Sequence, residues 1–335
     1  MTREKIQRIK GLVLICTVVA LFALLISAPI FAEKKQSFEI WLEGLRSEAL
    51  RKGISKATLQ EALVDLEPIP RVIELDRNQP ESKLTLGEYL NRVTPEGRIA
   101  VGRKKLMEYR SLLAKVSQRY GVQPRFLIAL WGVETNFGQL SGGFPVIDAI
   151  ATLAYDGRRS SFFRTELFHA LRILDEGHIS ADQMTGSWAG AMGQLQFMPS
   201  TFRKFAVDHD GDGRIDIWNN LGDAFASAGN YLSHFGWAKD QIWGKEVRLP
   251  DGFDRRLVGL KTRKRHSEWK ALGVRRLKGE DLSEEPNFLA SVVEPDGRGG
   301  RAFLVYDNYR TLLKWNRSHY FGVAVGTLAD RIMGL

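Results

Sequence analysis

The segment GVETNFG, residues 132–138, holds the carboxylate with the clearest chemical potential in this sequence, Glu134. It stands near the end of an apolar run with helical spacing that begins at Pro124. An acid is unfavourable at a helix C-terminus, because the helix dipole is negative there. Apolar neighbours such as Trp131 and Phe137 disfavour the charged form and raise the pKa of a carboxyl group. We therefore predict that Glu134 is a proton donor near neutral pH; the alternative is a helix-terminal Glu that simply faces water.

A second segment, GSWAGAMGQLQFMPSTF at residues 186–202, combines small residues with neutral polar and aromatic ones. Its glycines and alanines let the backbone approach a ligand closely. Ser187 and Gln196 offer hydrogen-bonding groups suited to sugar hydroxyls and acetamides, and Trp188 and Phe197 offer flat apolar faces. The composition predicts a sugar-binding loop, while a tight helix-packing turn is the alternative.

Two further segments carry weaker signals. Arg158 and Arg159, in AYDGRRSSFFRTEL at residues 154–167, are candidates for contact with acidic substrate groups, although such neighbours are more often a surface pair. In KWNRSHYF, residues 314–321, Asn316 and Tyr320 are able to supply an amide and a ring to a sugar site. Polar residues on a helix surface are the alternative for this last segment.

The segment DHDGDGRID, residues 208–216, has the spacing of a calcium loop. Position 12 of the loop is Asn219 instead of the usual bidentate Glu, so we expect an acid further on to close the site. An Asx-rich turn without metal is the alternative. A calcium ion here would be structural, with none required for the chemistry. The predicted ligands are Asp208, Asp210, Asp212, the carbonyl of Arg214, and Asp223.

Composition excludes several other classes of function. The six histidines form no HExxH pair, and no GxSxG elbow or phosphate-binding glycine loop is present, so a zinc peptidase is unsupported. Cys16 is the only cysteine, which excludes thiol catalysis downstream of it. The formal net charge is +9, and residues 255–278 contain ten Lys or Arg and one acid. This run predicts either a solvated surface or attraction to an anionic polymer; nucleic acid fits poorly.

Residues 1–32 form a segment of their own. A basic region with Lys5, Arg8 and Lys10 precedes an uncharged stretch over residues 11–32, which is typical of a secretory signal peptide. The stretch is also long enough for an uncleaved membrane anchor. Both interpretations place the protein in the cell envelope, exported to the periplasm or held at the membrane by its N-terminus.

The remaining chain is expected to be mainly α-helical with a small β part. A long helical region over 37–66 is followed by residues 67–97, which are rich in proline and turn residues and are expected to wrap the surface. The predicted parts are an N-terminal helical region over 33–120, a core over 121–236 with the calcium-type loop at 208–223, a β subdomain over 237–307, and a C-terminal helical segment over 308–335. Further helices are expected at 98–118, 124–134, 145–154, 160–175, 199–206, 221–235 and 308–333, and strands at 245–249, 257–261, 288–293 and 302–306.

Taken together and in this order, the five segments resemble those of the lytic murein transglycosylase B family, over roughly residues 37–333. The resemblance implies a lysozyme-like helical core with a small β subdomain and an EF-hand-like calcium loop. It also implies cleavage of the β-1,4 bond between N-acetylmuramic acid and N-acetylglucosamine in peptidoglycan. Carried over by motif, Glu134 matches the catalytic acid/base. The substrate-groove positions are matched by Ser187, Gln196, Phe197 and Asn316, and the arginines near the peptide-bearing sugar by Arg158 and Arg159. The missing acid at loop position 12 departs from the pattern.

Ordinary glycosidases use two carboxylates, whereas the strong motifs here supply only Glu134. One carboxylate suits a lytic transglycosylase, a lyase that forms 1,6-anhydromuramic acid with one Glu as acid and then base. The nearest alternative is a hydrolytic muramidase using a second carboxylate such as Asp156 or Asp175. A non-catalytic peptidoglycan-binding protein is the alternative from another class. The partners implied are glycan strands and proteins of envelope complexes.

Overall fold

The computed structural model describes residues 36–78, 84–282 and 288–335. The chain divides into two units, residues 1–44 and 45–335. Helix α2 (Phe38–Arg51) begins in the first unit and ends in the second, and the description below concerns the second unit. The predicted signal or anchor segment lies outside the described residues. Among the helices described, none has the length and apolar character needed to cross a membrane.

Helix α8 (Pro124–Thr135), the expected helix after Pro124, is the centre of one helical group. It packs against α15 (His319–Met333), α6 (Glu96–Glu108) and α7 (Arg110–Tyr120), and α15 also contacts α5 (Leu86–Val93). Gly132 permits the close approach, because a Cβ there would lie 2.8 Å from the ring of Phe137 and 3.1 Å from Leu328. The single helix expected over 98–118 is wrong, since the chain breaks at Tyr109 into α6 and α7.

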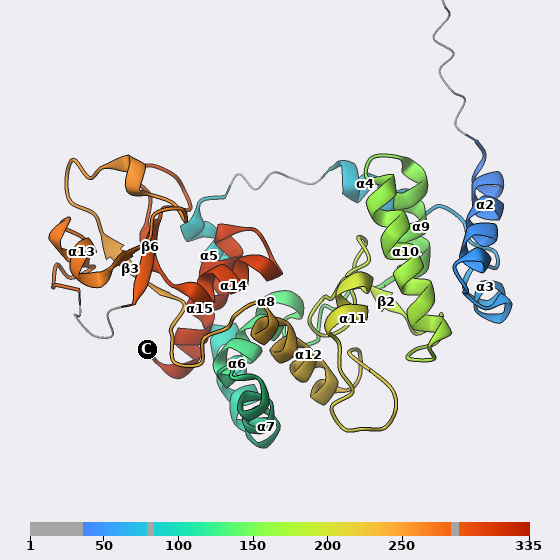
Figure 1. Ribbon diagram of the computed structural model, residues 1–335, viewed down its shortest axis with the longest axis horizontal. Helices are drawn as coiled ribbons and strands as arrows, with labels where there is room; N and C mark the ends of the chain where they lie inside the picture. The colour runs from blue at the N-terminus through green and yellow to red at the C-terminus, as the bar shows by residue number, and fades with distance from the viewer. Residues whose placement is uncertain (1–35, 79–83, 283–287) are drawn as a thin grey trace, which may run out of the picture. The chain divides into compact units, whose positions relative to one another are not determined.

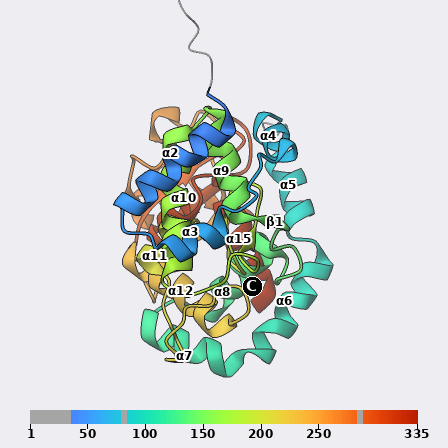
Figure 2. The ribbon, with the colours of Figure 1, turned by 90° about the vertical axis from the view of Figure 1, so that its right-hand side faces the viewer.

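A second group is built on α9 (Val146–Asp156) and α10 (Ser160–Asp175), which lie side by side in both views (Figures 1 and 2). Helix α11 (Pro199–Phe205) packs between α10 and α12 (Leu221–His234), and α3 (Lys56–Ala62) lies against α10. A short antiparallel pair, β1 (Phe144–Pro145) and β2 (Thr185–Gly186), leads directly into the Gly/Ala-rich segment. This pair therefore fixes where that segment begins.

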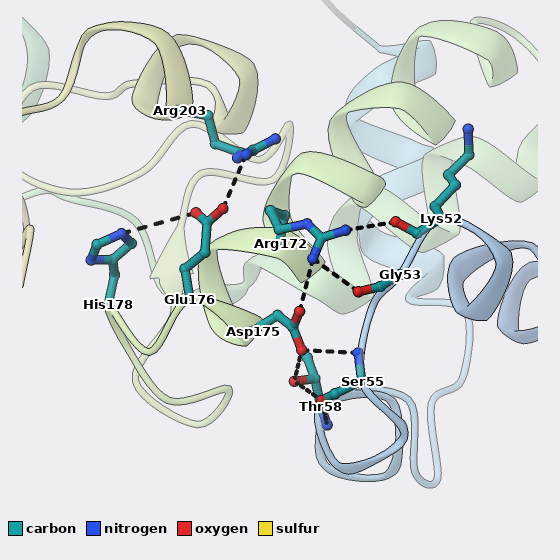
Figure 3. Close-up of polar contacts among 9 residues, drawn as sticks. All are labelled: Lys52, Gly53, Ser55, Thr58, Arg172, Asp175, Glu176, His178 and Arg203. Atoms are coloured by element: carbon teal, nitrogen blue, oxygen red, sulfur yellow. Dashed lines mark hydrogen bonds and ion pairs between the residues drawn. The ribbon is translucent and has the colours of Figure 1, made fainter.

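Two expectations for the N-terminal region are wrong. The helix expected over 37–66 is two helices, because Gly53 turns the chain with a φ of 79° between α2 and α3. Figure 3 shows the turn held on α10: Arg172 donates to the carbonyls of Lys52 and Gly53, while Asp175 accepts from Ser55 and Thr58. Residues 67–97 do not simply wrap the surface, for they contain the helices α4 (Pro70–Arg77) and α5.

The β part is a five-stranded antiparallel sheet in the order β4-β6-β7-β3-β5. Strands β6 (Leu289–Val293) and β7 (Ala302–Val305) are almost continuously apolar, which is typical of strands covered on both faces. The strand expected at 257–261 is wrong: its first residue ends a 3-10 turn (Arg255–Leu257), and only Val258 makes an isolated bridge. The other elements are β3 (Gly244–Arg248), β4 (Lys264–Arg265), α13 (His266–Ala271) and β5 (Arg275–Arg276).

After the sheet, helix α14 (Asp307–Trp315) follows β7 and packs against α12 and α15. The expected helix over 308–333 is therefore two helices, separated at Asn316, where the backbone is extended. This break leaves Trp315 as the last helical residue of α14.

Candidate active site

Glu134 lies in the last turn of α8, where the backbone bends sharply. Asn136, Phe137 and Gly138 follow with φ values of 50°, 60° and 85°, a left-handed run that is unfavourable for the first two residues. Gly138 is required, because a Cβ there would lie 2.5 Å from the side-chain oxygen of Gln194. The turn ends the helix directly after Glu134, so the carboxyl group stands at a helix end.

The carboxyl group of Glu134 has one close polar partner in the described chain, the indole of Trp315, whose Nε1 donates to Oε1 at 2.7 Å. Trp315 is held by ring contacts with Phe197 at 5.2 Å and Tyr231 at 5.0 Å between centroids. Burial raises the pKa of Glu134 to about 7, while the hydrogen bond from Trp315, which favours the charged form, lowers it. The predicted protonated carboxyl near neutral pH therefore has a physical basis in its surroundings.

Tyr89 on α5 lies close enough to Glu134 for the two to interact electrostatically. Burial raises the pKa of Tyr89, and the nearby charge of Glu134 raises it further. The ring of Tyr320 lies 5.6 Å from that of Tyr89, and its hydroxyl donates to Asp296 and to the carbonyl of Leu84 at 3.3 Å. Tyr320, predicted to face sugar, thus joins α15 to the start of α5 and supports Tyr89.

Arg98 on α6 supports the turn after Glu134. Its Nε donates to the side-chain oxygen of Asn136 at 3.0 Å, and its Nη1 donates to the carbonyl of Val93. Burial lowers the pKa of this arginine, and Tyr89 partly offsets the effect. Sequence analysis missed Arg98, Tyr89 and Trp315, although Trp315 stands beside Asn316 in a segment already singled out.

Within the Gly/Ala-rich segment, Ser187 stabilises its own turn. Its Oγ accepts from the amides of Ala191 at 3.0 Å and Ala189 at 3.3 Å. The hydroxyl proton stays available to donate, because a serine hydroxyl both donates and accepts. Gly186 is needed, since a Cβ there would lie 2.2 Å from the carbonyl oxygen of Ala191. Both the predicted ligand role and the alternative packing role are compatible with this turn.

Gln196 and Phe197 lie where this segment meets α14. Gln196 has a φ of 55°, and its Nε2 donates to the carbonyls of Ser141 at 2.9 Å and Gly193 at 3.1 Å. Its Oε1 has no hydrogen-bond donor among the described residues. Phe197 is buried and packs edge-on against Trp315, so its ring supports the indole that contacts Glu134. Asn316 is exposed, and its side-chain oxygen accepts from the amide of Ser318.

Gln194 joins this segment to the helix that carries Glu134. Its Oε1 accepts from the indole of Trp131 at 2.8 Å, and its carbonyl accepts from Thr135 at 2.8 Å. Its Nε2 donates to the carbonyl of Trp218, just beyond the Asp-rich segment. One side chain thus connects the helix α8, the Gly/Ala-rich segment and the Asp-rich segment.

The paired arginines have a buried partner that the sequence did not reveal. Asp76 on α4, with a side chain only 3% exposed, bonds Nε of Arg158 at 3.0 Å and a terminal nitrogen of Arg159. The arginine side chains remain 53% and 44% exposed. A buried carboxylate therefore holds two guanidinium groups whose other edges face solvent.

Three of the predicted metal ligands lie together. Asp208, Asp210 and Asp212 each place one carboxylate oxygen within 4.8 Å of the others, which suits a hard cation such as calcium. The amide of Arg214 donates to Asp212 at 2.8 Å. Asp223, the predicted closing ligand, is fully buried, its two oxygens accept the amides of His209 and Asp216, both at 2.8 Å, and its role as a metal ligand stays a prediction. Asp223 closes the loop onto α12 and is not grouped with the three acids.

The two carboxylates considered for a hydrolytic mechanism are held in structural contacts. Asp156 pairs with Arg77 at 2.8 Å. Burial raises the pKa of Asp175, but hydrogen bonds from Ser55 and Thr58 outweigh burial and lower it overall. Arg172 pairs with the same carboxylate at 2.9 Å (Figure 3). Neither group contributes to the raised pKa of Glu134.

The basic run over 255–278 is largely compensated by acids. Several of its cations form ion pairs within the β part, so the run has far less unpaired charge than its sequence indicates. The pairs are Arg255–Glu294, Arg256–Asp254, Arg263–Asp307, Lys264–Glu268, Lys270–Asp281, Arg275–Asp281 and Arg276–Glu280.

Comparisons with known proteins identify the family of this chain. Residues 37–330 match the family described as transglycosylase SLT domain. The chain is 30% identical over 298 residues to membrane-bound lytic murein transglycosylase B of Escherichia coli strain K12, covering 84% of this chain and 79% of that protein. The solved structure of SltB3 from Pseudomonas aeruginosa in complex with NAG-anhNAM-pentapeptide is 44% identical, with a TM-score of 0.86 over 89% of this chain and 80% of that one.

A further solved structure is that of the Escherichia coli lytic transglycosylase Slt35 in complex with calcium. It is 28% identical, with a TM-score of 0.73 over 87% of this chain and 92% of that one. The fold, mainly helical with a small sheet, is thus that of the lysozyme-like lytic transglycosylases. The chain belongs to the lytic murein transglycosylase B family. The roles of its individual side chains remain predictions.

Proposed function

We propose that Glu134 is the acid and then the base with which this peptidoglycan lytic transglycosylase cleaves the bond between N-acetylmuramic acid and N-acetylglucosamine. The observation that supports this role is the raised pKa of the Glu134 carboxyl, about 7, under the single hydrogen bond from Trp315. A protonated carboxyl at neutral pH is the state that a general acid needs.

In the first step, Glu134 donates its proton to the bridging oxygen, and the bond from that oxygen to C1 of the muramic residue breaks. The N-acetylglucosamine leaves with a hydroxyl group. The substrate's own N-acetyl oxygen stabilises the positive charge at C1, so the protein needs no second carboxylate. Charge development on Glu134 is favoured by the indole N–H of Trp315, because that hydrogen bond strengthens as the carboxyl ionises.

In the second step, the Glu134 carboxylate accepts the proton of the muramic C6 hydroxyl, whose oxygen bonds to C1. The product is 1,6-anhydromuramic acid, and Glu134 is protonated again. A second carboxylate near Glu134 would raise its pKa by charge repulsion, yet in the described chain burial alone raises it. This favours the one-carboxylate scheme over a hydrolytic muramidase.

Around this centre we assign substrate contacts to Ser187, Gln196 and Asn316, and positioning roles in the substrate groove to Phe197 and Tyr320. Ser187 and Gln196 keep hydrogen-bonding capacity after their structural bonds are counted. Phe197 acts through Trp315, and Tyr320 acts through Tyr89. Arg158 and Arg159 present cationic edges suited to the carboxylates of the stem peptide.

The test is mass spectrometry of purified sacculi digested with the wild type and with Glu134→Gln. We expect anhydromuropeptides, one water lighter than hydrolytic products, from the wild type and none from the variant. Asp156→Asn serves as a matched carboxylate control and should still give the anhydro products. Reducing-end muramic acid alone would support the muramidase, and equal release by wild type and Glu134→Gln would support a non-catalytic binding protein.

We also infer that the Asp-rich loop holds a structural calcium ion, with ligands from Asp208, Asp210, Asp212, the carbonyl of Arg214, and Asp223. The three clustered carboxylates support this assignment. Calcium saturating the site at about 100 times its Kd would add about 2.7 kcal/mol to the stability of the folded state. An unchanged melting temperature after calcium is added to chelated protein would contradict the site.

The place of action that suits this substrate is the cell envelope. We propose that the protein works in the periplasm, either free after removal of residues 1–32 or held at the membrane by them. Fractionation of cells, followed by mass determination of the N-terminus, tests this. A protein recovered in the cytosol with residue 1 intact would contradict the proposal.

A further inference from the structure

Beside the candidate active site, the outer face of α14 borders a hollow that the mechanism does not use. It has a volume of about 470 Å³ and is lined by Leu260, Arg310, Leu313, Lys314 and Arg317, here called the α14 basic pocket. Three of the five lining residues are cations, and no acid lines it. Such a composition is suited to an anionic ligand with apolar parts.

The pocket and the catalytic carboxyl share one helix. Leu313 and Lys314 follow Arg310 by three and four residues, so both lie on its face of α14. Trp315, the next residue, turns its indole to Glu134, and Asn316 follows in the extended break. Two residues of the pocket, Lys314 and Arg317, are therefore direct chain neighbours of Trp315 and Asn316.

Arg310 is a fixed cation. Its Nη2 donates to the carbonyl of Leu260 and to Oγ of the buried Ser291, both at 2.7 Å. The acid nearest to it in the described chain, Asp307, lies 3.8 Å from Nε and is already paired with Arg263 at 2.7 Å. Burial lowers the pKa of Arg310, and the positive charge of Arg263 adds to this effect. The surroundings therefore leave an excess of positive charge.

Lys314 and Arg317 are exposed, and neither has an acidic partner among the described residues. The helix C-terminus accounts for a lysine at this position, because cations are favourable there. It does not account for Arg310, which is held in place by neutral oxygens. Two exposed cations beside one fixed cation leave the pocket able to take more than one carboxylate.

We propose that the α14 basic pocket binds the carboxylates of the stem peptide that the muramic residue carries, a proposal that rests on the proposed function. In the intact strand the lactyl carboxyl of the muramic residue is bound in the amide to the peptide, so the sugar units supply no negative charge. The stem peptide, in contrast, carries free carboxylates and small apolar side chains. The cations receive the carboxylates, and the two leucines face the apolar side chains. The pocket thereby selects peptide-bearing glycan near Trp315.

The test uses Lys314→Gln combined with Arg317→Gln, which removes two charges and leaves Arg310 in place. The matched control is Lys104→Gln combined with Lys115→Gln, two exposed cations on α6 and α7. Each protein is assayed on intact sacculi and on glycan strands stripped of peptide by an amidase, with the freed lactyl carboxyl of each muramic residue blocked as its amide. We expect the pocket variant to lose about 3- to 10-fold in kcat/KM on intact sacculi, mainly through KM, and nothing on stripped glycan. The control variant should match the wild type on both substrates.

Equal loss on both substrates would overturn the proposal, because it would mean that Trp315 has been disturbed; no loss on either would overturn it as well. Loss of binding to anionic phospholipid vesicles, without discrimination between the glycans, would assign the pocket to membranes instead. A second measurement does not depend on catalysis: the affinities of a peptide-bearing and of a bare disaccharide are compared on the Glu134→Gln protein. A preference for the peptide-bearing form that the pocket substitutions abolish would uphold the pocket even if the wild type made no anhydro product.

Discussion

The substitution Trp315→Phe removes the hydrogen bond that lowers the pKa of Glu134. The indole N–H donates to the carboxylate at 2.7 Å, so it favours the charged form. Phenylalanine keeps an aromatic ring against Phe197 but has no donor. The pKa of Glu134 should therefore rise above its value of about 7.

The size of the rise follows from the energy of the bond. A hydrogen bond to a charged group contributes about 1.5–3 kcal/mol, and one pKa unit corresponds to about 1.4 kcal/mol, which gives about one to two units. Glu134 is partly exposed, so water replaces some of the lost bond. We therefore expect a rise of about one unit.

The assay is the pH dependence of kcat/KM on sacculi across roughly pH 5 to 9, which reports the pKa values of the free enzyme. Activity requires protonated Glu134 and so falls as pH rises through its pKa, and Trp315→Phe should move this fall to higher pH. Phe197→Leu, which loosens Trp315 without removing the donor, should lower the rate and leave the midpoint in place. An unchanged or lowered midpoint in a well-folded Trp315→Phe protein would refute the role assigned to the indole.

Three other substitutions test the surroundings of the site. The pKa of Glu134 is about 7 in the folded protein against 4.5 ordinarily, so the free energy of unfolding of the wild type should fall as the pH rises from 4.5 to about 7. Glu134→Gln lacks this titration. Its stability relative to the wild type should therefore rise by up to about 3 kcal/mol over that range and stay constant above it. Urea unfolding at several pH values measures this, and a gap independent of pH would contradict it. Asp76→Asn should cost about 1–2 kcal/mol in urea unfolding, since it leaves two partly exposed arginines without their buried partner. It should also weaken cleavage of peptide-bearing glycan more than of stripped glycan, and equal effects would argue against a peptide contact. Gly138→Ala should lower the melting temperature, with a cost of about 1–3 kcal/mol, because φ is 85° and the new Cβ meets Gln194; wild-type melting would show that the turn relaxes freely.

Much of the fold was predictable because it depends on local pattern. The helices beginning at Pro124, Ser160, Pro199 and Leu221 were expected close to their observed bounds, since apolar spacing and N-terminal prolines act within a few residues. The errors lie where local signals are weak. Residues 67–97 contain prolines and turn residues, yet α5 forms there with a capping box from Thr85 and Glu88.

The resemblance of the segments to a family was specific because five of them occur in a fixed order. The raised pKa of Glu134 was likewise predicted from its apolar neighbours, and the structure gives the same direction. Spacing alone did not reveal which way the carboxylate of Asp223 points. Its oxygens accept two backbone amides, one from each end of the Asp-rich loop.

By itself the sequence determined the helical class, the family and the carboxylate at the centre, since these depend on residue types, local periodicity and order. Tertiary structure alone decided what surrounds that carboxylate. Trp315 is 181 residues from Glu134 along the chain. Tyr89 and Arg98 come from helices that precede Glu134 in the sequence. No local pattern encodes such contacts, because they arise only when α5, α6, α8 and α14 pack together. For the same reason the buried Asp76 beneath the paired arginines and the basic pocket on α14 became visible only in the folded chain.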